Sequence, residues 1–72
     1  MDKQERALRA RDLLEDEILQ EVVERIRSGA LHRFEHSAPE DSDARNRAHM
    51  QLWALRMLIG EVETIASEYA KP

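Results

Sequence analysis

The sequence predicts an all-α fold, an antiparallel two-helix hairpin that oligomerisation completes into a helical bundle. Three observations lead to this prediction. The 72 residues include only two glycines and two prolines, while Ala, Leu, Glu, Arg and Met, which favour helices, are abundant. Apolar residues recur at helical spacing in two long segments. A single stretch rich in turn-forming residues separates these two segments, so we expect two helices joined by one turn.

The length of the chain predicts one domain, residues 1–72. So short a chain buries a modest share of its surface when it folds, and it usually needs a disulfide, a metal or a partner chain for stability. The sequence contains no cysteine, which excludes disulfides and thiolate metal sites. Association with another chain is the remaining means of stabilisation, and we expect a homo-oligomer, a larger protein assembly, or both.

The first helix is predicted over about residues 4–36. On a helical wheel its apolar residues fall within one half of the circumference: Ala7, Leu8, Leu14, Ile18, Leu19, Val22, Val23, Ile26 and Ala30. Leu13 and Leu31 lie off this stripe. Gly29 permits two interpretations, because Ser28-Gly29 could end the helix, whereas its place in the middle of the stripe favours a helix interior with close approach of another backbone. We favour the second interpretation, in which Gly29 belongs to a helix–helix contact.

The turn is predicted over residues 37–42 and the second helix over about 42–69. Ser37 and Glu40 have the spacing of a capping box, with Pro39 tolerated in a first helical turn. Ser42 is the alternative N-cap, followed by Asp43. The two helices are expected to pack around eight apolar residues: Leu14, Ile18, Val22, Ile26, Leu55, Leu58, Val62 and Ile65.

A second apolar strip lies on the second helix, beside the residues expected in the core, and consists of Met50, Trp53, Ala54 and Met57. A lone hairpin cannot cover both strips. Exposed apolar ridges of this kind usually mark interfaces. We therefore predict that Trp53 and its two neighbouring methionines contact another chain, as they would in a four-helix bundle of two hairpins.

Charge is unevenly distributed, although the net charge is only −4. Acidic residues occupy the segment from Asp12 to Glu24 with no basic residue among them, and an antiparallel hairpin brings two more alongside. The predicted acidic patch comprises Glu15, Asp16, Glu17, Glu21, Glu61 and Glu63. Such blocks are commonly solvated helix faces, but this one also suits a basic partner. Phosphate contacts could come from Lys3, Arg6, Arg9 and Arg11, although no aromatic residue is interleaved with them.

No pattern indicates catalysis, a cofactor or a membrane span, so we do not expect an enzyme. The serines are not paired with a histidine, and a hairpin offers no cleft in which carboxylates could be desolvated. His32 and His36 share a helix face, but no third metal ligand has suitable spacing, and His49 is interpreted as an interface-edge residue. No stretch approaches the roughly 20 apolar residues of a membrane-spanning helix.

The segment 9–21, Arg-Ala-Arg-Asp-Leu-Leu-Glu-Asp-Glu-Ile-Leu-Gln-Glu, resembles the opening of small helical accessory proteins of tailed bacteriophages and prophages. Those proteins share a Leu-Leu-Glu-Asp motif (here 13–16), an aromatic residue (Phe34), a Ser/Thr-x-x-Asp/Glu turn (within 37–41) and an Arg-rich second helix (45–59). They have proline where this chain has Glu17, which favours an unbroken first helix here. The chain also has a shorter tail after Tyr69, which argues against a function that a longer tail would carry.

The resemblance implies a virion or DNA-packaging accessory role, in the host cytoplasm or associated with the virion, and it supplies no catalytic residues. Three functions are therefore expected in order of preference. The first is a structural or assembly protein that acts through helical contacts. The second is a small acidic inhibitor of a host protein that handles nucleic acids. The third is a DNA-binding accessory protein that uses the basic N-terminal segment, so nucleic acid is an open but less favoured partner.

Overall fold

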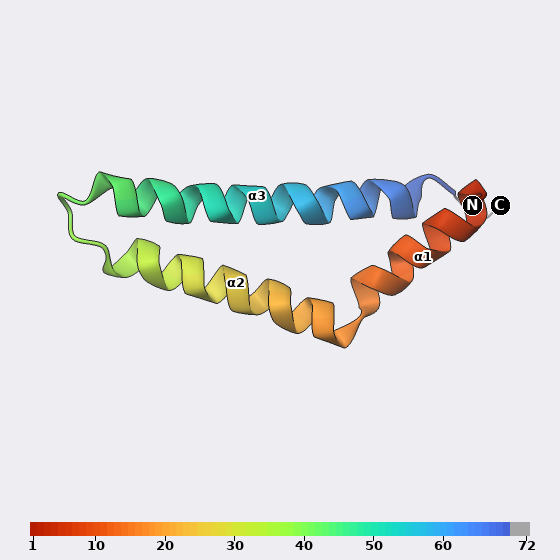
Figure 1. The fold of residues 1–72 in the computed structure, drawn as a ribbon, viewed down its shortest axis with the longest axis horizontal. Helices are drawn as coiled ribbons and strands as arrows, with labels where there is room; N and C mark the ends of the chain where they lie inside the picture. The colour runs from red at the N-terminus through yellow and green to blue at the C-terminus, as the bar shows by residue number, and fades with distance from the viewer. Residues whose placement is uncertain (70–72) are drawn as a thin grey trace.

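The computed structural model describes residues 1–69, and all the regular structure in this part of the chain is helical. Helix α1 spans Lys3–Glu15, α2 spans Glu17–His36 and α3 spans Ser42–Ser67. As Figure 1 shows, α1 and α2 follow one another along α3 and run in the opposite direction. The all-α prediction is confirmed. The prediction of two helices is wrong, because the expected first helix is two helices. The short tail after Tyr69 lies outside the described residues.

The first helix is interrupted at Asp16, which ends α1 and begins α2. Its backbone is extended (φ −63°, ψ 124°), and its N–H donates to the carbonyl of Leu13 at 3.2 Å. The Asp16 carboxylate accepts the N–H of Leu19 at 2.8 Å, as an N-cap does. The side-chain amide of Gln20 donates to the Leu14 carbonyl at 3.1 Å, which satisfies one of the carbonyls that the end of α1 leaves free.

The absence of proline at position 17 therefore does not keep the helix unbroken. Glu17 is the first residue of α2, where a carboxylate interacts favourably with the helix dipole. In one continuous helix, Asp12 would instead repel Asp16 at a spacing of four residues, which costs about 0.2–0.5 kcal/mol. Apolar periodicity hides such a break, because both helices still carry apolar stripes.

The turn between α2 and α3 is organised by Pro39 and Asp41. Ala38 precedes Pro39, and the residue before a proline is disfavoured in helical conformation. Helix α2 ends two residues before Ala38, at His36, and the backbone of Ser37 is already extended. The N–H of Asp41 donates to the Ala38 carbonyl at 2.9 Å, which closes a turn with proline at its favoured second position. The Asp41 carboxylate then accepts the Ala44 N–H at 3.1 Å. Both predicted N-caps were therefore wrong, because Asp41 caps α3 in place of Ser37 or Ser42.

Helix α1 is attached to the C-terminal end of α3. Ala7 and Ala10 are buried there, since small side chains allow two helices to approach closely. The Arg11 guanidinium donates to the carbonyls of Ala66 at 3.1 Å and Tyr69 at 2.6 Å. These two bonds satisfy carbonyls at the end of α3 and fix the position of α1 along it. A further ion pair joins α1 to the residue after α3, between Arg6 and Glu68 at 3.7 Å.

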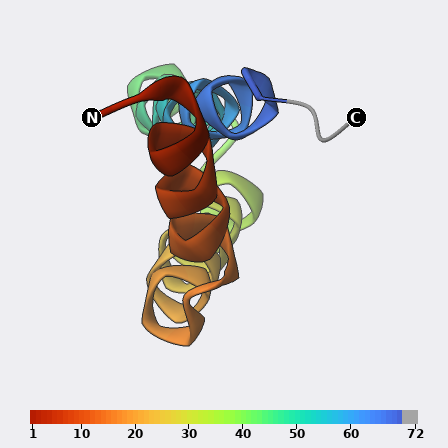
Figure 2. The same ribbon diagram turned by 90° about the vertical axis from the view of Figure 1, so that its right-hand side faces the viewer.

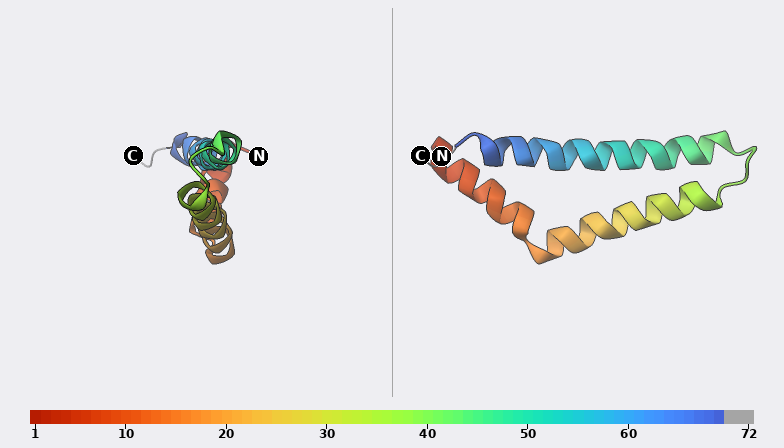
Figure 3. Two further views of the ribbon diagram at one scale, coloured as in Figure 1. Left: turned by 90° about the vertical axis from the view of Figure 1, so that its left-hand side faces the viewer. Right: turned by 180° about the vertical axis from the view of Figure 1, so that it is seen from behind.

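Helix α2 is attached to α3 near the turn. Ala30 and Ala48 are buried in that region, Arg33 donates to the Gln51 side chain at 2.5 Å, and Arg45 donates to the Ala38 carbonyl at 2.7 Å. Between these two attachments the chain bows outward, so that the junction of α1 and α2 lies farthest from α3 (Figures 1 and 3). Among the described residues, the helices thus touch mainly at the two ends of the molecule.

The buried core is small and consists mostly of alanine. Leu55, which is 8% exposed, is the only large buried side chain among the described residues. The predicted core was therefore wrong for Ile18, Val22, Ile26 and Leu58, which are exposed, whereas Leu14, Val62 and Ile65 are half-buried. The break at Asp16 explains the difference within α2. It changes the direction of the chain, so that Leu19, Val23 and Ala30 face α3, whereas Ile18 and Val22 lie to one side of that face.

The molecule is elongated, with extents of 53 × 19 × 19 Å and a radius of gyration of 16.0 Å. A compact domain of this length has a radius of gyration of about 11 Å. The accessible surface is 5782 Å², compared with about 4600 Å² expected for a folded monomer of this mass. The chain by itself therefore leaves exposed much surface that a compact protein would bury.

Candidate interaction surfaces

A ridge of large apolar side chains runs along α3 on the side away from α1 and α2. We call Met50, Trp53 and Met57 the α3 ridge; they are 64%, 55% and 48% exposed. Figure 2 shows α1 and α2 on one side of α3, and no helix of the described chain covers its other side. Ala54 is exposed beside the ridge. The structure thus places these predicted interface residues together on an uncovered helix face.

Gly29, the fifth predicted interface residue, lies inside α2 and has no positive φ. The prediction that the helix continues through it is confirmed. A Cβ added at Gly29 would lie 3.5 Å from the Arg33 guanidinium and would come within 4 Å of no atom of α3. The close backbone approach predicted at this position was therefore wrong within the chain, and Ala30 makes the contact with α3.

A second apolar surface lies on one side of the α2–α3 pair, and the sequence did not predict it. Ile18, Val22 and Ile26 form a helical row with Gly29 and Arg33, and Leu58 lies in a row with Gln51 and Ala54 on α3. The Arg33–Gln51 hydrogen bond joins the two rows, so they lie on the same side of the molecule. All four large side chains are exposed, Ile18 and Leu58 the most, at 67% and 59%.

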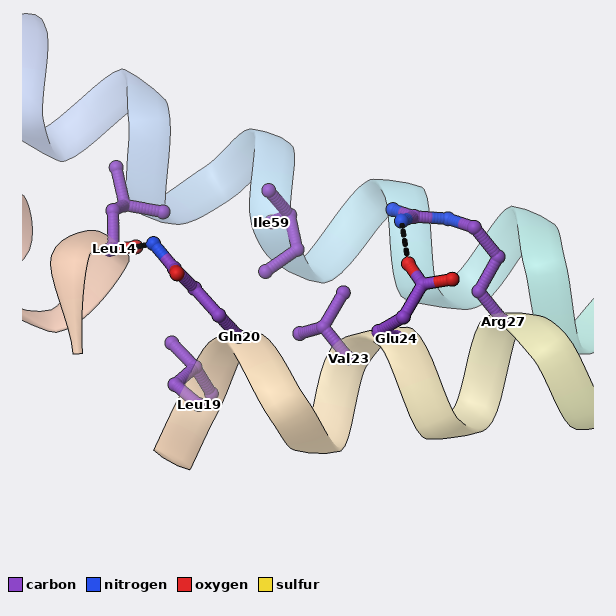
Figure 4. A pocket seen from close by; sticks show the side chains of 7 residues that line it. All are labelled: Leu14, Leu19, Gln20, Val23, Glu24, Arg27 and Ile59. Atoms are coloured by element: carbon purple, nitrogen blue, oxygen red, sulfur yellow. Dashed lines mark hydrogen bonds and ion pairs between the residues drawn. The ribbon is translucent and has the colours of Figure 1, made fainter. Parts of the chain in front are cut away.

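An apolar groove lies where α1 and α2 bow away from α3. Its volume is about 270 Å³. Val23 of α2 and Ile59 of α3 point toward each other across it, and Leu14 and Leu19 close its end near the junction (Figure 4). Its polar edge carries Gln20 and the pair of Glu24 and Arg27, which are 2.9 Å apart. The groove follows from the break at Asp16, so periodicity alone gave no signal of it.

The predicted acidic residues are exposed and distributed over the bowed half of the molecule. Glu15, Asp16, Glu17 and Glu21 lie at and after the α1–α2 junction, and Glu61 and Glu63 lie on α3. Because Arg11 contacts Ala66 and Arg33 contacts Gln51, the junction lies level with the part of α3 that includes Glu61. Two of the six have structural roles, since Asp16 caps α2 and Glu21 pairs with Arg25 at 3.7 Å.

The basic residues of α1 are only partly free for phosphate. Arg11 is half-buried and donates both of its bonds to the end of α3, and Arg6 pairs with Glu68. Lys3 and Arg9 are exposed, and within the described residues neither forms an ion pair. The segment predicted to contact phosphates therefore contains the residues that hold α1 in place.

The histidines of α2 lie near the turn, where the ring centroids of His32 and His36 are 4.2 Å apart. Within residues 1–69, no three histidine or carboxylate side chains come together as a metal site would require. No helix of the described chain has the length and apolar character to span a membrane.

The fold and its uncovered faces define a small helical protein with large apolar side chains on its surface. No protein-family model matches this chain, and neither does any curated protein or solved structure.

Proposed function

We propose that this chain is a non-enzymatic assembly protein that acts through helical protein–protein contacts made by the α3 ridge. The observation that carries the proposal is the inversion of the usual apolar distribution. Alanines fill most of the core, whereas the largest apolar side chains, including the only tryptophan, are exposed. Contiguous exposed apolar surface typically marks an interaction site, and tryptophan is enriched at the centres of interfaces.

The size of the molecule also supports this proposal. Full burial of a large apolar side chain contributes roughly 1.5–3 kcal/mol, and the alanine-rich core holds little of that stabilisation. A partner chain that covers Met50, Trp53 and Met57 would supply what the core lacks. We propose a second copy of this chain as that partner, either alone or within a larger assembly.

We place this activity in the assembly of a tailed bacteriophage particle or in its DNA packaging, in the host cytoplasm or on the virion. The support for this setting is the sequence resemblance, together with the position of Glu17. Glu17 is the first residue of α2, and proline is especially common at the first position of a helix. The resembling proteins have proline at this same position.

The proposal predicts that Trp53→Glu abolishes self-association, because it places a charge in the apolar contact. Sedimentation velocity at several concentrations would measure this, together with helical circular dichroism. Leu31→Glu is the matched control, since Leu31 is a similarly exposed apolar residue (42%) on α2, away from the ridge. We expect a loss of mass for Trp53→Glu and none for Leu31→Glu. Equal behaviour of the two variants would contradict the proposal.

A second candidate, a small acidic inhibitor of a basic partner, is favoured by the exposure of Glu15, Glu17 and Glu21. Reversing these three residues to lysine leaves the α3 ridge intact and should preserve the helical fold, because exposed substitutions usually cost little. If the inhibitor function is right, this variant loses a partner from its native host that the wild-type chain binds. Unchanged binding of that partner would contradict the inhibitor function.

Direct DNA binding, the third function, is less favoured because Arg6 and Arg11 are engaged with the end of α3.

A further inference from the structure

We infer that the partner of the α3 ridge is a second copy of α3 packed antiparallel to it, in a register that places Met50 opposite Gly60 of the second copy. This inference rests on the proposed self-association and specifies its geometry. It starts from the side of α3 that α1 and α2 leave uncovered (Figures 2 and 3).

The uncovered side of α3 carries a regular row with alternating spacings of four and three residues. We call this row the α3 seam, and it consists of Asn46, Met50, Trp53, Met57, Gly60 and Thr64. This is the spacing by which two helices pack side chains into each other's gaps. Every member is exposed except Gly60, which is half-buried. The row therefore has both the spacing and the accessibility that a helix–helix contact requires.

The α3 seam is complementary to itself when it is reversed. With Ala54 near a two-fold axis, Asn46 lies opposite Thr64 of the second copy, Met50 opposite Gly60 and Trp53 opposite Met57. In this register each large side chain thus lies opposite a small or a flexible residue of the second copy. A Cβ at Gly60 would find no atom within 4 Å in the single chain, so the space above this glycine is open to the methionine of a second copy.

Charge selects the antiparallel orientation. The first half of α3 carries Arg45 and Arg47 after Asp43, its middle carries Arg56, and its second half carries Glu61 and Glu63. Reversal brings Arg47 of one copy level with Glu61 of the other on one side of the seam, and His49 level with Glu63 on the other side. Parallel packing would instead bring Glu61 of one copy level with Glu63 of the other and leave Arg47 without an acidic residue opposite it, and such like-charge pairs are unfavourable. Arg56 lies near the two-fold axis and is the one basic residue that lies beside the same residue, Arg56, of the second copy in the antiparallel register.

The charges that this pairing uses are available. Within the described residues, Arg47, Glu61 and Glu63 are exposed and form no ion pair or side-chain hydrogen bond. The chain as a whole also exposes more surface than a compact protein of its mass, 5782 Å² where about 4600 Å² is expected. This excess exceeds the roughly 800 Å² that each partner buries in an ordinary stable interface.

The register can be tested with engineered disulfides, because the natural chain has no cysteine. Asn46→Cys and Thr64→Cys are prepared as separate variants and mixed in a glutathione redox buffer. In the antiparallel register the two cysteines are adjacent, whereas equivalent cysteines of the two copies lie about 27 Å apart. We expect the mixed disulfide between the two variants, identified by mass, and no disulfide in either variant alone. Ser28→Cys, exposed on α2, measures the random background.

A disulfide in Asn46→Cys alone would show parallel packing and overturn the inference. Associated wild-type protein with no cross-link above the Ser28→Cys background would overturn it too, while leaving the proposed function standing. Protein that is monomeric at all concentrations would contradict both the inference and the proposed function.

The charge pairing predicts that Arg47→Glu weakens self-association about tenfold. Mixing the Arg47→Glu variant with the Glu61→Lys variant should restore association. Association that is indifferent to Arg47→Glu would contradict the charge pairing.

Discussion

The Asp16 carboxylate accepts the Leu19 N–H at 2.8 Å, and the Asp16 backbone ends α1. Asp16→Ala removes this N-cap and should lower the free energy of unfolding by about 1 kcal/mol. Asp12→Ala is the control, because Asp12 is exposed and caps neither helix. Urea denaturation followed by circular dichroism measures both variants. A stability gain for Asp16→Ala would mean that α1 and α2 prefer to join, contrary to the structure.

Gly29 lies in the interior of α2, where alanine is the better helix former. An added methyl group would make an ordinary 3.5 Å contact with the flexible Arg33 side chain. Gly29→Ala should therefore raise the free energy of unfolding by about 0.5–1 kcal/mol. Thermal denaturation at constant protein concentration provides the measurement. Destabilisation by alanine would show that another backbone approaches Gly29 closely.

At the scale of single helices, α1 depends on Arg11. The charged Arg11 guanidinium donates two hydrogen bonds, to the carbonyls of Ala66 and Tyr69. A hydrogen bond to a charged group contributes about 1.5–3 kcal/mol to stability. Arg11→Ala should therefore accelerate amide hydrogen exchange in α1 more than in α2. Arg9→Ala, at an exposed position of α1, is the matched control. Equal protection of α1 in both variants would show that Arg11 does not anchor the helix.

The helices themselves also show what the sequence can and cannot predict. Apolar spacing correctly predicted α3 and the position of Trp53 on its uncovered side. It also correctly predicted that the helix continues through Gly29, because the apolar pattern of a helix extends over many residues. It missed the cap at Asp16, which depends on one carboxylate and one N–H. The rows of α2 that face α3 followed from that cap, so Ile18 and Val22 were assigned to the core in error. The groove beside Val23 and Ile59 depends on the same bend.

For the whole molecule, the consequence is an elongated chain with an alanine core and an exposed tryptophan. Its shape is held mainly by contacts at the two ends of α3, through Arg11 and Arg33. Marginal stability is expected for such a chain, because the net stability of small domains rarely exceeds about 3–5 kcal/mol. Binding to a partner that recognises only the folded state adds stability in proportion to the logarithm of its concentration. We therefore expect the melting temperature of the wild-type chain to rise with its own concentration.

The most direct test of the account is the mass of the wild-type protein, measured by sedimentation equilibrium over a dilution series with Trp53 emission recorded on the same samples. Trp53 is the only tryptophan, so its emission reports on the α3 ridge alone. Self-association predicts a mass above the 8.4 kDa of one chain, with blue-shifted emission that moves to the red as the mass falls on dilution. A folded monomer of 8.4 kDa at every concentration, with the emission of a water-exposed tryptophan throughout, would contradict self-association.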